Sequence, residues 1–548
     1  MYKTFLILIS VLFFNITFAQ YTPSSITVDT AITKATKTKS FYLKNPVNRA
    51  IQITNIRTLT QQFTFITSPF TLNALDSILV SISFSSNQNV TYRDFFIFEN
   101  KGLNSPIVYY VTATAKYPEA LYSFTQGLFD EALKTALRSF TTTGYIQLGY
   151  NTARDKMFET VDDYGGDTIE CVYIGRKIKA TNRTEAQNQN FNTEHTLPQS
   201  IFNSAEPMVS DLFHLYPTDA APNSARSNYP FGIPVTNITY DVGGSKLGKD
   251  ASGETVFEPR DVHKGNVARS LFYFCVKYNT SIGSFMSAKQ EGILRQWNNF
   301  DTVDTRERLR NTRIKSFQNV YNPFIDHPEL VERIRSTYTV ANTVLKAEVS
   351  ASPFNVKYDT LNANDTASYY VAVLNYGTGS LIINSAAASI PQFTVENVPS
   401  NIPAGELRYI KVKFKPTETS QTYNGTLTIQ NNDSNIIVNL QGFSNTQTNV
   451  RNISSEVPKE LILMQNFPNP FNPYTKIKFA IPNDLAGKYF TLKVYDLTGK
   501  EVKELVNASL NAGYYETEFN GSGLSSGVYI YRLNTGTYQL QKKFTLIK

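Results

Sequence analysis

Apolar and polar residues alternate along two separate parts of the chain, at about residues 20–117 and 346–445. In the second part, Ile410, Val412 and Phe414 are separated by single lysines. A period of two places apolar side chains on one face of a β-strand and polar ones on the other. Both parts are therefore predicted to be all-β sandwiches.

The two β-rich parts align with each other at a nearly constant offset. Val80, Ile82 and Phe84 correspond to the alternating residues of the second part, and Thr91-Tyr92 corresponds to Thr422-Tyr423. This indicates an internal duplication around a central segment. Both copies resemble the immunoglobulin-like sandwich domains of the abnormal-spindle and hydin type. Neither contains a catalytic constellation, so a scaffold role is favoured over adhesion.

The central segment, residues 118–345, has a different period. Leu128–Phe140, Val267–Tyr278 and Leu330–Tyr338 carry apolar residues three and four apart with few β-branched residues, which predicts helices. Strand-like and loop segments lie between them. The class expected for this segment is therefore α+β.

The first 19 residues have the pattern of a secretory signal peptide. Lys3 precedes the apolar run Phe5–Phe14, and Ala19 precedes Gln20 at a suitable cleavage position. The run is too short to span a bilayer, which needs about 20 apolar residues. No later segment is long and apolar enough to be transmembrane, so the mature protein is expected to be exported and soluble.

A polar linker at 446–462 leads into Gln465–Pro473, a run rich in proline and asparagine that imposes an extended, turn-rich entry. The turn Asp496–Gly499 and the run Leu524–Tyr531 follow. These motifs resemble the C-terminal sorting domain of the type IX secretion system over residues 463–548. The resemblance implies a C-terminal β-sandwich, the type IX secretion machinery as a partner, and a secreted or cell-surface location. The whole chain is thus expected to be multidomain, with the α+β domain between two immunoglobulin-like sandwiches.

Charge changes this interpretation little. The net charge is +7, but residues 118–345 hold 24 Lys and Arg against 26 Asp and Glu. Two basic runs, Arg176–Arg183 and Arg306–Lys315, could contact phosphates or simply form solvated faces.

Cys171 and Cys275 are the only cysteines. Export favours a disulfide, which would close a loop of about 100 residues and contribute about 4 kcal/mol in the chain-entropy model. Two buried thiols are the alternative, and two cysteines are too few for a thiolate zinc site.

Side chains suited to acid–base and metal chemistry gather in the central segment. Glu194 and His195 are adjacent, and Asn223 follows 28 residues after His195. An imidazole with an ordinary pKa of about 6.5 can accept a proton from water at neutral pH. Mg²⁺, like other hard divalent cations, prefers carboxylate and amide oxygens and keeps several waters. This set suits metal-assisted phosphodiester hydrolysis, with Mg²⁺ or another divalent cation as cofactor.

The local pattern predicts a strand at Asp211–Pro217, which includes His214, and a helix that begins at Pro222–Arg226. Strand, loop and helix around His195 and Asn223 form the outline of a ββα-metal finger.

Five motifs in order resemble the endonuclease I family of exported nucleases: Glu194-His195, Asp211–Pro217, Asn223–Asn228, Phe257–Arg269 and Asn322–Pro328. The resemblance implies an endonuclease of low sequence specificity, with DNA as substrate and RNA as a second candidate. It implies His195 as general base, and Glu194 and Asn223 as ligands of one Mg²⁺. Asn266 and Tyr321 depart from the family, which usually has an acidic residue and an arginine there.

Further candidates surround this core. Arg226 is expected either to hold a phosphate with its planar fork or to form a structural salt bridge. His214 is expected to orient loops or phosphate, or to be part of the core. Substrate contacts are also assigned to Asn228, Lys264 and Arg269. His263 is expected to be structural, and Asp326 to cap a final helix with Pro328 in its first turn.

Two other functions remain open. The chain could be a cell-surface adhesion or binding protein with an inactive nuclease-like module, or a surface metallopeptidase. Zinc hydrolysis is disfavoured because the His-Glu-x-x-His motif is absent.

Overall fold

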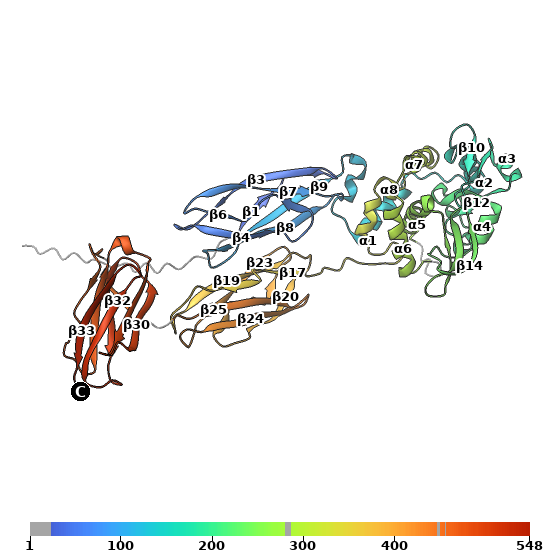
Figure 1. Cartoon of the computed structure of the whole chain (residues 1–548). Coiled ribbons are helices and arrows are strands. Elements are labelled where there is room, and N and C mark those ends of the chain that lie inside the picture. Colours follow the sequence, from blue (N-terminus) through green and yellow to red (C-terminus); the bar gives the residue numbers. More distant parts are fainter. Residues whose placement is uncertain (1–22, 280–285, 446–449, 455) are drawn as a thin grey trace, which may run out of the picture.

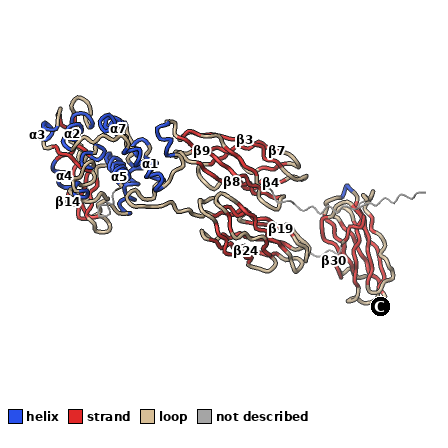
Figure 2. The backbone as a smooth tube through the Cα atoms, turned by 180° about the vertical axis from the view of Figure 1, so that it is seen from behind, coloured by secondary structure: helices blue, strands red, loops and turns tan. Residues whose placement is uncertain are grey.

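The computed structural model describes residues 23–279, 286–445, 450–454 and 456–548. The expected signal peptide lies outside the described residues. Four bodies follow one another along the chain: a β-sandwich, an α+β domain, a second β-sandwich and a C-terminal β-sandwich (Figure 1). Helices concentrate in the second body, and strands dominate the other three (Figure 2).

The first sandwich packs a sheet of order β1-β9-β8-β4-β6, with β2 on β9, against a sheet of order β3-β7-β5. Its strands are β1 (Ser24–Thr27), β2 (Ala31–Ile32), β3 (Thr36–Lys44), β4 (Ile51–Arg57), β5 (Phe63–Phe65), β6 (Phe70–Leu72), β7 (Ser77–Ser85), β8 (Thr91–Lys101) and β9 (Ile107–Lys116). Val80, Ile82 and Phe84 are buried in the core between the two sheets, as the alternation predicts.

The second sandwich repeats this topology, with sheets of order β18-β25-β24-β20-β22 and β17-β19-β23-β21. Its strands are β17 (Val349–Ser352), β18 (Asn355–Lys357), β19 (Ala367–Asn375), β20 (Leu381–Ala388), β21 (Phe393–Glu396), β22 (Asn401–Ile402), β23 (Leu407–Phe414), β24 (Thr422–Asn431) and β25 (Ile436–Phe443). In each copy a short strand pairs in parallel with the last strand, β1 with β9 and β18 with β25. The shared strand order agrees with the internal duplication inferred from the sequence.

The two sandwiches lie side by side (Figure 1). Phe95 and Ile97 of β8 point away from their own core and join a separate buried cluster with Leu374 and Leu407 of the second sandwich. Because both faces of β8 are covered, its middle is a continuous apolar run rather than an alternating one.

The C-terminal body packs a sheet of order β26-β31-β28-β27 against one of order β30-β29-β32-β33. Its strands are β26 (Arg451–Ser454), β27 (Ile462–Leu463), β28 (Tyr474–Ile481), β29 (Tyr489–Tyr495), β30 (Glu501–Ser509), β31 (Gly513–Asn520), β32 (Gly527–Asn534) and β33 (Gln539–Leu546), with a short 3-10 helix at Asn483–Leu485.

The central domain combines helices with short sheets around one large apolar core. Its α-helices are α1 (Asp130–Thr142), α2 (Tyr150–Lys156), α3 (Arg183–Asn188), α4 (Ala220–Arg226), α5 (Lys264–Tyr278), α6 (Ala288–Phe300), α7 (Thr305–Gln318) and α8 (Pro323–Asp326). Its strands are β10 (Thr168–Glu170), β11 (Lys177–Lys179), β12 (Phe191–His195), β13 (Leu215–Asp219), β14 (Thr236–Val242), β15 (Ser245–Lys249) and β16 (Thr255–Glu258). Its shorter helical turns are η1 (Ala120–Thr125), η2 (Met157–Val161), η3 (Gln199–Phe202), η4 (Met208–Ser210), η5 (Leu212–His214), η6 (Asp261–His263) and η7 (Pro328–Arg333).

Two of the three predicted helices are confirmed as α1 and α5. The prediction of a helix over Leu330–Tyr338 is wrong, because this stretch is the 3-10 turn η7 followed by irregular chain. Asp326 does not cap it, since its carboxylate accepts hydrogen bonds from Asn311 and Tyr122. Asn322 caps α8 instead.

The expected disulfide is also wrong, because Cys171 and Cys275 are both free and buried. The Sγ of Cys171 accepts a hydrogen bond from the backbone N–H of Asp219 at 3.1 Å. Cys275 lies within α5, in the interior of the domain.

Candidate active site

The candidate residues lie on a β-hairpin and on the helix that follows it. Strand β12 pairs antiparallel with β13, with Glu194 opposite Tyr216 and His195 opposite Leu215. Helix α4 begins directly after β13 and returns to β12, where the Asn223 amide donates to the Thr193 carbonyl at 3.4 Å. This contact brings Asn223 beside the strand that carries Glu194 and His195.

Glu194 is buried, and its Oε1 accepts a hydrogen bond from the Tyr173 hydroxyl at 2.7 Å. The same oxygen lies 3.2 Å from Nε of Arg226. Burial raises the pKa of Glu194, although Arg226 and Tyr173 oppose this shift. A further cation beside this carboxylate would therefore favour its ionised form.

His195 has different neighbours, because successive residues of a strand point to opposite faces. Its ring centroid lies 5.5 Å from that of Tyr150 and 5.3 Å from that of His214. Nδ1 is 3.2 Å from the side-chain amide nitrogen of Gln199. Because an amide nitrogen can only donate, Nδ1 accepts this hydrogen bond and carries the lone pair of the imidazole. Among the described residues, the buried Nε2 has no hydrogen-bond partner.

Burial lowers the pKa of His195 well below its ordinary value, and the positive charges that His214, Arg154 and Arg226 can carry act in the same direction. The Val209 carbonyl opposes them. The imidazole is therefore neutral at pH 7, which is the form that can accept a proton.

Of its two expected roles, Arg226 has the structural one, a salt bridge with Glu194. Its side chain is 1 % exposed, with Nε beside Glu194, Nη1 donating to Ser227 O and Nη2 donating to Thr196 O. All three nitrogens have protein partners, so the guanidinium holds the Glu194 carboxylate in place and does not offer an open fork to a phosphate.

Two of the three other proposed substrate contacts are engaged within the protein. Arg269 is fully buried and pairs with Glu307 at 2.6 Å. Lys264 pairs with Glu258 and Asp261, both at 2.7 Å. A buried guanidinium cannot reach a substrate, so Arg269 is corrected to a structural role. Asn228 is exposed just beyond α4 and remains available.

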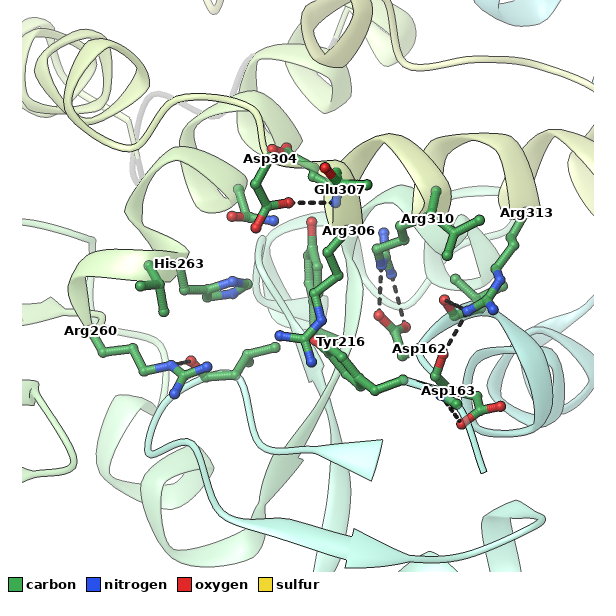
Figure 3. Close-up of a pocket in the computed structure, with 18 residues that line it drawn as sticks. Asp162, Asp163, Tyr216, Arg260, His263, Asp304, Arg306, Glu307, Arg310 and Arg313 are labelled. Carbon is green, nitrogen blue, oxygen red and sulfur yellow. Dashed lines mark hydrogen bonds and ion pairs between the residues drawn. The ribbon is translucent and has the colours of Figure 1, made fainter. Parts of the chain in front are cut away.

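His263 is buried and packs edge-on against Tyr216, the cross-strand neighbour of Glu194, with ring centroids 4.8 Å apart. Both residues line a cavity that does not include Glu194, His195 or Asn223 (Figure 3).

His214 lies in the turn η5, one residue before β13, and not within the strand predicted at Asp211–Pro217. Its Nε2 donates to the Met208 carbonyl at 2.7 Å. Burial is the main cause that lowers the pKa of His214 to about 4. His214 is therefore a buried, neutral ring that packs against His195 rather than a phosphate ligand.

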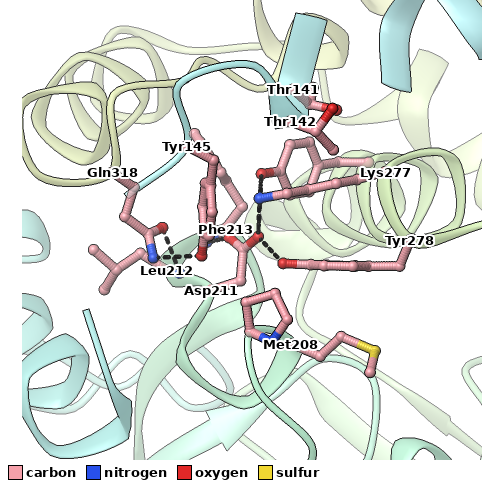
Figure 4. Close-up of polar contacts among 12 residues, drawn as sticks. Thr141, Thr142, Tyr145, Met208, Asp211, Leu212, Phe213, Lys277, Tyr278 and Gln318 are labelled. Atoms are coloured by element: carbon pink, nitrogen blue, oxygen red, sulfur yellow. Dashed lines mark hydrogen bonds and ion pairs between the residues drawn. The ribbon is translucent and has the colours of Figure 1, made fainter. Parts of the chain in front are cut away.

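Asp211 fixes the start of this turn (Figure 4). Its Oδ2 accepts hydrogen bonds from the Lys277 ammonium at 2.7 Å and from the Tyr273 and Tyr278 hydroxyls at 3.1 and 2.6 Å. Its Oδ1 accepts from the backbone N–H of Phe213 at 3.1 Å. The Asp211 carboxylate thus joins η5, which carries His214, to α5.

Sequence reasoning missed Tyr173, Tyr150 and Gln199 as neighbours of the site. Tyr173 precedes Glu194 by 21 residues and sits in no motif that could have marked it. Gln199 carried only a weak signal, because it follows His195 by four residues.

Comparison with known proteins agrees with this layout. The endonuclease I family model matches residues 129–329, a HYDIN/CFA65/VesB-like Ig-like domain model matches 355–443, and the secretion system C-terminal sorting domain model matches 465–548. No helix within the described residues is long and apolar enough to cross a membrane. The sorting domain marks a secreted or cell-surface protein of the type IX pathway.

Relatives with similar sequences are extracellular nucleases. An extracellular ribonuclease of Bacillus amyloliquefaciens is 32% identical over 236 residues, 39% of this chain and 78% of the relative. An extracellular ribonuclease of Bacillus subtilis is 30% identical over the same length and shares. An extracellular deoxyribonuclease of Aeromonas hydrophila is 28% identical over 119 residues, 22% of this chain and 50% of the relative. The chain therefore belongs to the endonuclease I family.

Proposed function

We propose that the protein is a secreted endonuclease that hydrolyses phosphodiester bonds of DNA and RNA with the help of one Mg²⁺ ion. The hairpin β12–β13 and helix α4 would form a ββα-metal motif. The observation that carries this proposal is the hydrogen bond from Asn223 to the Thr193 carbonyl, which sets an amide beside the strand with Glu194 and His195.

The residues fit a magnesium ion. Glu194 is a buried carboxylate with a raised pKa, and a bound cation would lower this pKa and favour the ionised form. Asn223 offers a second oxygen ligand. The described residues contain no group of three or more His, Cys, Asp or Glu side chains arranged for a metal. A site with one carboxylate, one amide and several waters suits Mg²⁺ better than Zn²⁺, although other divalent cations share this preference. Bound there, the ion would neutralise charge on the phosphate and on the leaving oxygen.

His195 is the proposed general base. Nδ1 would accept a proton from water in place of its contact with the Gln199 amide, while the water oxygen bonds to phosphorus and the bond to the leaving oxygen breaks. His214 and Tyr150 would hold the imidazole in orientation. Arg226 and Tyr173 would hold Glu194.

Activity on both DNA and RNA is supported by the relatives, which include ribonucleases and deoxyribonucleases. Low sequence specificity follows if contacts run mainly to phosphates, because phosphates carry no base identity.

The test is cleavage of plasmid DNA and of single-stranded RNA by the purified mature protein. His195→Ala should lower turnover by about 100-fold or more, with an unchanged circular dichroism spectrum. His327→Gln is the control, since His327 is also a buried histidine of the central domain but stacks on Tyr117 and pairs with Glu119 and Glu329 rather than with a candidate catalytic residue, and it should retain activity. EDTA should abolish cleavage and Mg²⁺ should restore it.

Intact plasmid and RNA after incubation with Mg²⁺ would refute the proposal. The function would then lie in the two sandwiches, as in an adhesion or binding protein whose nuclease-like domain is inactive. Full activity of His195→Ala would instead refute only the identity of the base.

A further inference from the structure

A cavity of about 460 Å³ opens in the central domain between α7, the turn η6 and the chain that follows η2 (Figure 3). Its wall includes four arginines: Arg260, Arg306, Arg310 and Arg313. This volume is within the range of pockets that hold small organic ligands. Neither Glu194, His195 nor Asn223 lines it, so the cavity is separate from the proposed catalytic residues.

Two buried nitrogens on this wall have no hydrogen-bond partner in the described part of the chain: Nε2 of His263 and Nη1 of Arg310. The two residues are 4 % and 5 % exposed. The other nitrogens of Arg310 are engaged, with Nε donating to Asp162 at 2.8 Å and Nη2 to the Leu212 carbonyl at 2.9 Å. A buried donor without an acceptor is costly, and Nη1 of Arg310 is always a donor, so it points to an acceptor that the described residues do not supply. The Nε2 of His263 can donate to the same acceptor in one of the two neutral tautomers of the imidazole.

The carboxylates of the wall are already engaged. Asp162 pairs with Arg310 at 2.8 Å. Asp304 accepts from the Glu307 N–H, and Asp163 accepts from the Gly165 N–H. Glu307 is the partner of Arg269. Arginines and carboxylates are balanced in number on this wall. Affinity for an anion must therefore come from the unused Nη1 of Arg310 and from the imidazole of His263 rather than from net charge.

The rim adds an aromatic and apolar surface. The Arg306 guanidinium lies over the Tyr164 ring and pairs with Glu170 at 3.0 Å. Val262 and Leu309 line the same cavity and are 64 % and 48 % exposed. Burial lowers the pKa of Arg306 to about 10, which a nearby anion would counteract. A ligand that fits has an anionic group inside and a flat apolar group at the rim.

We propose that this cavity binds a nucleoside monophosphate, with the phosphate at Arg310, His263 and Arg306 and the base against Tyr164, Val262 and Leu309. Guanidinium groups match phosphate oxygens in geometry, and bases stack on aromatic rings. The choice of a nucleotide over other phosphate esters rests on the proposed nuclease function, since hydrolysis of a phosphodiester bond leaves a nucleoside with a terminal phosphate at one of the two new chain ends. Their binding needs no catalysis.

The test is isothermal titration calorimetry of the full mature protein with adenosine 5′-monophosphate, adenosine and inorganic phosphate, in EDTA. The monophosphate should bind at one site, and more tightly than either fragment. Arg306→Gln should weaken its binding by about 10-fold or more, as expected for loss of a charged hydrogen bond. Arg308→Gln removes the same charge from an exposed position of α7 outside the cavity and should leave binding unchanged.

A second variant tests the same site independently if Arg306→Gln does not fold. Tyr164→Leu should weaken binding of the monophosphate and leave binding of inorganic phosphate as it was. Absence of saturable binding, equal affinity for inorganic phosphate, equal affinity for adenosine, or equal effects of Arg306→Gln and Arg308→Gln would each overturn the nucleotide site. Plasmid cleavage measured on the same samples separates this outcome from failure of the proposed function, because the calorimetry requires no activity.

Discussion

His214 is held neutral by its surroundings, and this makes the central domain sensitive to acid. Burial lowers its pKa from 6.5 to about 4, so the folded form resists a proton that the unfolded chain accepts below pH 6.5. Its contribution to stability is complete above pH 6.5 and is lost as the pH falls toward 4. The shift corresponds to about 3 kcal/mol.

His214→Gln keeps a donor for the Met208 carbonyl but cannot titrate. We expect this variant to lose about 3 kcal/mol less stability than the parent protein between pH 7 and pH 4. Urea unfolding followed by the fluorescence of Trp297, the single tryptophan and part of the central core, measures this difference. Equal losses in the two proteins would show that His214 is not the acid-sensitive group.

The free cysteines give a second prediction about single residues. Because Cys171 and Cys275 are unpaired, dithiothreitol should leave the Tm of the central domain unchanged. A disulfide over about 100 residues would contribute about 4 kcal/mol, and its reduction would lower Tm by several degrees. Thiol titration of the protein unfolded without reductant should find both thiols. A lowered Tm in reductant, or a missing pair of thiols, would restore the disulfide.

Between elements, the Asp211–Lys277 ion pair ties η5 to α5 in a fully buried setting. Lys277→Met should destabilise the domain by about 3 kcal/mol or more, because it leaves a buried carboxylate without its cation. Adding Asp211→Asn should recover part of this loss, since the remaining group is neutral. Urea unfolding of both variants measures the recovery, and a double variant less stable than Lys277→Met would contradict the role of the charge.

Sequence patterns succeed for elements whose own residues decide their structure. Helices α1 and α5 and strand β23 carry a complete period of apolar residues, and each forms where the pattern places it. Leu330–Tyr338 has helical spacing, but it is a 3-10 turn and loose chain whose backbone carbonyls at Val331 and Ile334 accept from Arg295 of α6.

The candidate site could likewise be predicted only in part from the sequence. Glu194, His195 and Asn223 can be selected from residue type and order, and the structure places them on one hairpin and its helix. The pairing of Arg226 with Glu194 and the hydroxyl of Tyr173 could not be foreseen, because these contacts depend on which segments the fold brings together.

Across the whole molecule, the central domain is inserted between two sandwiches that contact each other. The chain enters it after β9 and leaves it before β17, and the sandwiches share the buried cluster of Phe95, Ile97, Leu374 and Leu407. A hydrogen bond from the Tyr370 N–H to the Asn104 carbonyl at 2.7 Å crosses the same interface. The two ends of the central domain are therefore joined to two sandwiches that pack against each other.

Leu374→Asp should separate the two sandwiches, because it places an unpaired charge in the buried interface between them. We expect a larger radius of gyration by small-angle X-ray scattering, while the Trp297 unfolding transition and plasmid cleavage stay unchanged. Ile437→Asp is the matched control, since Ile437 lies on the same sandwich at an exposed position. An unchanged radius in Leu374→Asp would show that the paired arrangement does not depend on this cluster, whereas loss of cleavage would show that the central domain needs the pair to function.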